Sequence, residues 1–147
     1  RFVPGYEAPV FMSWSAKTRG PLIRIPSVRG EKTRIELRSP DPSANPYLAL
    51  AVLLAAGLDG IKNQILPPDS VDEDIQAMTE KQRSELHIEA LPWNLMEAVC
   101  ELEKDALIRE VLGADLTAKT IASHKKEYHD YCMQVTEWEL ANYLHKM

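Results

Sequence analysis

The segment from Thr33 to Asp41, with the sequence TRIELRSPD, combines arginine and glutamate at a spacing that permits chemistry. Side chains alternate between the two faces of a β-strand, so Arg34, Glu36 and Arg38 are expected on one face, opposite two apolar residues. Guanidinium groups bind phosphate and carboxylate through fixed pairs of N–H donors, and a carboxylate oxygen can bind a hard cation. This face is a candidate site for an anion and a metal ion. The alternative is a solvated strand face that makes cross-strand ion pairs.

Three further charged residues precede this segment. Glu7 lies in the loop VPGYEAP, which is either a surface turn or a lid that brings a carboxylate to a site. Arg19 lies in the connection KTRGP, where backbone and side chain can both approach a phosphate. Arg24 interrupts the apolar run LIRI and needs an anionic partner or a water-filled cavity. Glu36 is a candidate for that partner.

The distribution of charge also points to an anion site. The whole chain has a net charge of −5, yet residues 1–46 hold 8 basic and 4 acidic residues, and residues 47–147 hold 9 basic and 18 acidic ones. A positive segment on an acidic protein indicates a local site for an anion. Nucleic acid is not expected as a partner, because the positive segment is short and forms no long basic face.

The composition excludes several classes of protein. With 147 residues, 45% of them apolar and 27% charged, the chain has the size and composition of one soluble globular domain. Cys100 and Cys132 are far apart and outside any C-x-x-C motif, which indicates a reducing compartment, hence the cytoplasm. The longest apolar run, Tyr47 to Leu58, is too short to span a bilayer, so no membrane partner is expected. The chain begins with Arg rather than Met, and we therefore expect a fragment or a processed product.

The elements that must position these residues are short strands followed by helices. Residues 10–16, 22–26 and 33–39 are predicted to form a small antiparallel array on which the arginines converge. Asn45 and Pro46 then predict the start of a helix that runs to about Ile65. This helix is apolar nearly all round and is expected to be buried. Residues 69–74 read as an acidic, solvated connection.

Capping signals predict the remaining helices. They are expected after Thr79, from Asn94 to about Lys104, from Asp105 to Gly113, from Asp115 onward, and from Thr136 to near Leu144. The predicted fold class is therefore α+β, with strands and loops in residues 1–45 and a mainly helical remainder in residues 46–147.

The chain resembles the C-terminal part of the catalytic domain of a bacterial type I glutamine synthetase. The resemblance spans residues 1–147 and rests on long, ordered matches. These matches are VPGYEAP at 3–9, RGPLIRIP at 19–26, RIELRSPDPSANPYLA at 34–49, AGLDGIKN at 56–63 and QVTEWE at 134–139.

The resemblance implies that the full-length enzyme forms glutamine from glutamate, ammonia and ATP through a γ-glutamyl phosphate intermediate. It implies that Arg1 and Arg38 bind glutamate. Glu7 matches a catalytic lid residue that closes over the intermediate, contributes to glutamate binding and helps to deprotonate ammonium. Arg19 matches a catalytic arginine that stabilises the transferring phosphoryl group and contacts both glutamate and nucleotide.

The resemblance also implies a nucleotide site and a metal site. Arg24 and Arg34 match arginines that contact the phosphates of the nucleotide, and Glu36 matches a ligand of a divalent metal, Mg²⁺ or Mn²⁺. Family members assemble into rings whose active sites lie between subunits, so the intact protein is expected to be a dodecamer-like homo-oligomer with two rings. The isolated chain is expected to be inactive.

The chain departs from the family pattern at two places, and two alternative functions remain. The family usually reads N-R-S where this chain has Thr18-Arg19-Gly20, and Gln76 stands where adenylylated members carry a tyrosine. The first alternative is a relative that ligates glutamate to an amine or polyamine. The second is a non-catalytic module that binds anions or mediates assembly.

Overall fold

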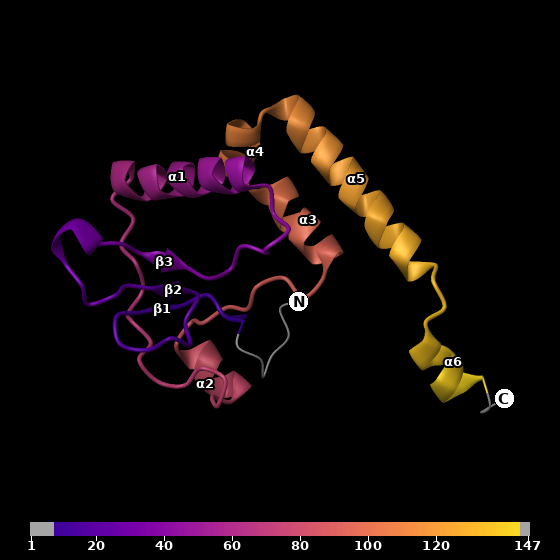
Figure 1. Cartoon of the computed structure of the whole chain (residues 1–147), viewed down its shortest axis with the longest axis horizontal. Helices are drawn as coiled ribbons and strands as arrows, with labels where there is room; N and C mark the ends of the chain where they lie inside the picture. The colour runs from indigo at the N-terminus through magenta and orange to yellow at the C-terminus, as the bar shows by residue number, and fades with distance from the viewer. Residues whose placement is uncertain (1–7, 145–147) are drawn as a thin grey trace. The chain divides into compact units, whose positions relative to one another are not determined.

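The computed structural model describes residues 8–144 and divides the chain into two compact units, one up to Trp93 and one from Asn94 (Figure 1). The strands and two of the helices belong to the first unit, and the second unit is helical. A boundary at residue 45, expected from the change in secondary structure, stays a prediction.

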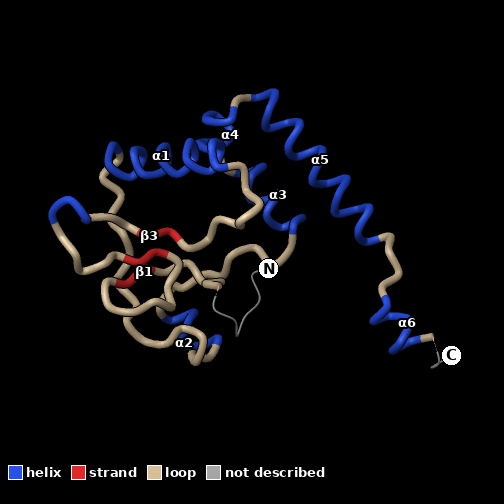
Figure 2. Tube along the Cα trace, viewed as in Figure 1, coloured by secondary structure: helices blue, strands red, loops and turns tan. Residues whose placement is uncertain are grey.

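The first unit contains a three-stranded sheet with the order β1 (Trp14–Ser15), β2 (Ile23–Arg24) and β3 (Glu36–Leu37) (Figure 2). This small sheet, followed by mainly helical chain, confirms the α+β class. β2 and β3 are antiparallel as expected. β1 and β2 are parallel, so the expectation that all strands are antiparallel is wrong for this pair.

The parallel pair follows from the loop between β1 and β2, residues 16–21, which we call the arginine loop because it carries Arg19. A tight two-residue hairpin would have made the pair antiparallel. Instead, Ser15 Oγ accepts hydrogen bonds from the backbone N–H groups of Lys17 (2.9 Å) and Thr18 (3.1 Å), which turn the chain out of the strand at once. The chain then returns in a wider loop and enters β2 in the direction of β1.

All three strands are shorter than predicted, and β1 is short because the residues before it have another partner. The Met12 N–H donates to the Glu89 carbonyl, and the Leu91 N–H donates to the Val10 carbonyl, both at 2.8 Å. This partner lies almost eighty residues along the chain, and no local pattern could have indicated it. A buried apolar cluster of this unit consists of Ile75, Met78 and Ile88, with Phe11 and Val71 packed against it, and Val10 and Leu22 are buried as well.

Helix α1 (Pro46–Lys62) begins where the capping signal predicts. The Asn45 side chain accepts hydrogen bonds from the N–H groups of Tyr47 and Leu48, and Pro46 occupies the first turn. The expected burial of this helix is wrong: none of its residues is buried, and Tyr47 is 83% and Ile61 75% exposed. Apolar composition predicts burial only where other elements cover the helix, and no described strand or helix of the first unit packs closely against α1.

The other helices also begin near their predicted caps. They are α2 (Glu80–Glu85), α3 (Leu95–Lys104), α4 (Ala106–Leu112), α5 (Ala114–Cys132) and α6 (Glu137–Tyr143). Thr79 and Thr136 form complete capping boxes, and Asn94 and Asp105 cap α3 and α4 through their side chains. α5 begins at Ala114, just before Asp115, because Gly113 adopts a positive φ of 78° and reverses the chain there.

Three helices of the second unit, α3, α4 and α5, pack on one another. α3 and α4 both contact α5, and α3 also contacts α4. Val99 on α3 and Thr117 on α5 are buried. No helix in the described part of the chain combines the length and apolar character that crossing a membrane requires.

Candidate functional site

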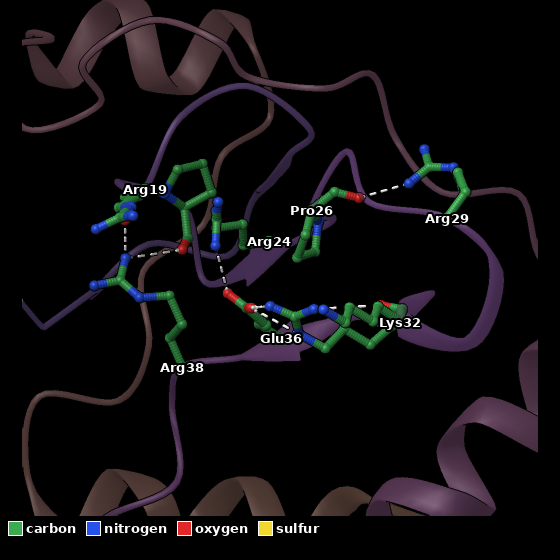
Figure 3. Close-up of polar contacts among 9 residues, drawn as sticks. Arg19, Arg24, Pro26, Arg29, Lys32, Glu36 and Arg38 are labelled. Atoms are coloured by element: carbon green, nitrogen blue, oxygen red, sulfur yellow. Dashed lines mark hydrogen bonds and ion pairs between the residues drawn. The ribbon is translucent and has the colours of Figure 1, made fainter.

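The pairing of β2 with β3 places Arg24 directly opposite Glu36. Arg24 Nη1 donates to Glu36 Oε2 at 2.8 Å (Figure 3). The two side chains are 26% and 30% exposed, so the pair is partly shielded from water. The anionic partner that Arg24 was predicted to need is therefore Glu36.

Arg34 binds the other oxygen of the same carboxylate. Its Nε and Nη2 atoms donate to Glu36 Oε1 at 3.0 Å and 2.6 Å, and its Nη1 donates to the Lys32 carbonyl at 3.2 Å. One carboxylate thus lies between two guanidinium groups, which leaves the group of three with a net positive charge. The Arg24–Glu36 contact is the cross-strand ion pair that the sequence left open, and the cluster also fixes two guanidinium groups with forked N–H donors beside Glu36.

The two arginines hold the pKa of Glu36 below its ordinary value of 4.5, mainly through the hydrogen bond from Arg24 and then through that from Arg34. Because the folded-state pKa is lowered, the carboxylate contributes stability at pH values above 4.5. That contribution is lost as the pH falls below 4.5 and through the folded-state pKa.

A carbon-13 NMR titration of the Glu36 carboxyl group should therefore show its midpoint below 4.5, and Arg24→Ala should move the midpoint upward. The upward shift is expected because the largest stabilisation of the charged form is then absent. A wild-type midpoint at or above 4.5 would contradict the geometry of the cluster.

Arg38 turns toward the arginine loop instead of toward Glu36 (Figure 3). Its Nη1 donates to the Arg19 carbonyl and, at 3.4 Å, to the Pro21 carbonyl. Its backbone N–H donates to the Leu22 carbonyl at 2.9 Å. Arg38 therefore ties the end of β3 to the arginine loop, while the side chain of Arg19 is exposed.

The structure thus brings together Arg24, Arg34 and Glu36 as one cluster, with Arg19 and Arg38 joined beside it. The roles expected for these five residues stay predictions. Arg1 and Glu7 lie outside the described residues.

Sequence reasoning missed Asp72. It was expected in a solvated acidic connection, but its carboxylate bonds to Ser15 and Lys17, both at 2.6 Å, at the start of the arginine loop. The partners are separated by more than fifty residues, so no local signal distinguishes Asp72 from the acidic residues around it.

Glu36 is the one metal ligand that the sequence predicts among the described residues, and this role stays a prediction. Among residues 8–144 there is no group of three His, Cys, Asp or Glu side chains that could hold a metal. A magnesium ion bound to protein commonly uses one or two carboxylates together with water and substrate phosphate. Glu36, with nearby donors for phosphate, fits one ligand position of such a site, and the other protein ligands would have to come from outside this set.

Comparison with known proteins places these features in context. Residues 1–143 match the family model described as "Glutamine synthetase, catalytic domain". The glutamine synthetase of Thermotoga maritima is 54% identical over 145 residues, which is 99% of this chain and 33% of that protein. That of Clostridium saccharobutylicum is 53% identical over 146 residues, again 99% of this chain and 33% of that protein. The chain spans about a third of the length of these curated relatives.

A solved structure supports the fold. The structure of the Plasmodium falciparum glutamine synthetase aligns with a TM-score of 0.75 and 20% sequence identity, covering 95% of this chain and 35% of that one. At this level of identity the similarity establishes the fold. The resemblance identified from the sequence motifs is thus confirmed by the family model and by the bacterial relatives.

Proposed function

The chain belongs to the family of glutamine synthetase catalytic domains, and we propose that it forms the C-terminal part of an enzyme that makes glutamine from glutamate, ammonia and ATP. The observation that carries this proposal is the family match over nearly the whole chain. The arginine cluster on β2 and β3 supports it, since phosphoryl transfer depends mainly on positioning and on neutralising charge.

In the proposed reaction, a glutamate side-chain carboxylate accepts the γ-phosphoryl group of ATP and forms γ-glutamyl phosphate, with ADP as the leaving group. Ammonia then attacks the acyl carbon and displaces phosphate to give glutamine. Arg24 and Arg34 bind phosphate oxygens of the nucleotide, and Arg19 neutralises the charge that develops on the transferring group. These guanidinium groups have N–H donors in fixed forks, which suit phosphate oxygens better than the point charge of lysine.

Glu36 is proposed as a ligand of Mg²⁺ or Mn²⁺, with Arg24 and Arg34 holding its carboxylate in place. Both arginines also keep this carboxylate deprotonated, as a metal ligand must be. When bound, the metal ion supplies positive charge beside the phosphate oxygens.

Three residues are proposed to bind glutamate or to act on ammonium: Arg1, Glu7 and Arg38. Arg1 and Arg38 bind glutamate. Glu7 closes over the intermediate and accepts a proton from ammonium, because only neutral ammonia can attack the acyl phosphate. A closed lid also protects that reactive group from water.

For the intact protein we propose a cytoplasmic homo-oligomer, a dodecamer-like double ring, as the family resemblance implies. The α1 helix supports the proposal that the intact protein contains further structure, because exposed apolar residues of this kind belong to a helix that other elements or subunits cover. The amine or polyamine ligase is not favoured, since the relatives reported above are named glutamine synthetases.

The proposal is tested by purifying the full-length protein and measuring glutamine formation from glutamate, ammonium, ATP and Mg²⁺. We expect ATP-dependent glutamine formation, with no comparable product when a polyamine replaces ammonium. The 147-residue chain alone is expected to give none, because it supplies one metal-binding carboxylate among its described residues. Polyamine as the preferred acceptor would contradict the proposal, and so would turnover by the chain alone.

A further inference from the structure

The arginine loop begins at a completely buried hydroxyl group. Ser15 is 0% exposed, and its Oγ accepts the hydrogen bonds from Lys17 and Thr18 that form the first turn of the loop. A buried hydroxyl group without a hydrogen-bond partner costs free energy. The hydrogen of the Ser15 hydroxyl therefore also needs an acceptor.

Asp72 receives that hydrogen. Ser15 Oγ donates to Asp72 Oδ1 at 2.6 Å, and Lys17 Nζ binds Asp72 Oδ2 at the same distance. One carboxylate thus holds the residue before the loop and a residue within it. The pKa of Asp72 is lowered by the hydrogen bond from Lys17 and then by that from Ser15, so the acceptor is charged at neutral pH.

Asp72 is itself held against β1. The Val71 N–H donates to the Trp14 carbonyl at 2.9 Å, and Trp14 Nε1 donates to the Pro68 carbonyl at 2.7 Å. Val71 also packs against the buried core. The segment from Pro68 to Asp72 is therefore bound to β1 through backbone hydrogen-bonding groups and through the Asp72 side chain.

The other end of the arginine loop is fixed as well. Pro21 is buried, and Arg38 donates to the carbonyls of Arg19 and Pro21. Asp72 at the start and Arg38 at the end together determine where the Arg19 backbone lies, while its guanidinium group extends into solvent.

From this geometry we infer that Asp72, acting through Ser15 and Lys17, is a positioning residue for Arg19. The inference rests on the proposed function, in which Arg19 neutralises the transferring phosphoryl group. Displacement of a catalytic group by about 1 Å can cost on the order of a hundredfold in rate, so a bond that holds the loop acts on the reaction without contacting the substrate.

The experiment compares Asp72→Ala in the full-length protein with the same change in an Arg19→Ala background, following glutamine formation with radiolabelled glutamate. With Arg19 present, Asp72→Ala is expected to lower kcat roughly tenfold, in the range of a lost bond to a charged group. With Arg19 absent, Asp72→Ala is expected to lower kcat no further, because there is no guanidinium left to position. Equal reductions in the two backgrounds would overturn the inference.

Two further variants separate positioning from loss of folding. Asp72→Asn keeps an oxygen for Ser15 and removes the charge that binds Lys17, so its effect should be smaller than that of Asp72→Ala. Asp69→Ala, an exposed position in the same connection, should leave kcat unchanged. A decrease for Asp69→Ala as large as that for Asp72→Ala would overturn the inference.

Hydrogen–deuterium exchange provides a readout that does not depend on activity. Peptides covering residues 16–18 should exchange faster in Ser15→Ala and in Asp72→Ala than in the wild type, since the bonds at Lys17 and Thr18 are weakened. Unchanged exchange would contradict the inference. If the wild-type protein makes no glutamine, the proposed function fails, and exchange still decides whether Asp72 orders the loop.

Discussion

Replacing Arg19 by alanine is expected to reduce glutamine formation by the full-length enzyme about a thousandfold, the scale seen when an arginine that stabilises a transferring phosphoryl group is removed. The loss should appear in kcat, with the KM for ATP changed much less, because the guanidinium is proposed to act mainly on the transition state. Steady-state kinetics with varied ATP measure both quantities.

The structure indicates that Arg19→Ala removes the guanidinium group without disturbing the fold around it. Arg38 binds the backbone carbonyl of Arg19, which alanine keeps, so the anchor of the arginine loop survives the change. The Arg19 side chain is exposed, and its removal leaves no cavity in a core.

The matched control is Arg29→Ala. Arg29 belongs to the same positive segment and donates to the carbonyls of Pro26 (2.6 Å) and Val28 (3.1 Å). The Arg29→Ala substitution removes the same charge from the same unit as Arg19→Ala. Because Arg29 has no proposed role in the reaction, kcat should stay within a few-fold of the wild-type value. An undiminished kcat for Arg19→Ala would refute the role proposed for Arg19. An equal loss of kcat in both variants would show that Arg19 acts only through its positive charge, as any arginine of this segment would.

Glu36→Gln is expected to lower activity by about a hundredfold at fixed Mg²⁺ and to raise the Mg²⁺ concentration needed for half-maximal activity. Glutamine has almost the same shape and can still accept hydrogen bonds from Arg24 or Arg34 through one oxygen. It lacks the negative charge and the second carboxylate oxygen that Glu36 is proposed to offer a divalent ion.

Folding should be affected far less than activity. The three side chains of the cluster are between 26% and 50% exposed, and ion pairs at such sites contribute little to stability. Thermal unfolding of the variant should therefore remain close to that of the wild type.

Glu31→Gln provides the comparison, since it removes one exposed carboxylate from the same unit. Its Mg²⁺ requirement should match that of the wild type. A Glu36→Gln enzyme whose Mg²⁺ dependence is also unchanged would show that Glu36 serves only as an ion-pair partner of the arginines.

The helix starts were readable from the sequence because N-capping is local. Asn45, Thr79 and Thr136 each bond to N–H groups within three residues, so the residues that decide the boundary stand next to it. The cross-strand partner of Arg24 was also accessible, because an arginine in an apolar strand needs an anion and Glu36 is the acidic residue of the next strand.

The direction of β1, the exposure of α1 and the role of Asp72 were not readable in this way. The parallel pairing of β1 with β2 depends on the path of the loop between them, which turns at the buried Ser15 hydroxyl. The role of Asp72 depends on its contact with that hydroxyl, 57 residues away. Burial of an apolar helix depends on what covers it, which its own residues do not encode.

The amino-acid sequence alone therefore determined the α+β class, the helix starts and the set of charged residues, since each follows from residue type and short spacing. It also identified the family, through the resemblance carried by the long motif matches. Apart from the Arg24–Glu36 pair, only the tertiary structure decided which of these charges meet. It bound Arg34 to the second oxygen of Glu36, turned Arg38 toward Arg19, and brought Asp72 to the arginine loop. Contacts between distant segments depend on the path of the whole chain, because residues far apart in sequence meet only where the chain between them brings them together.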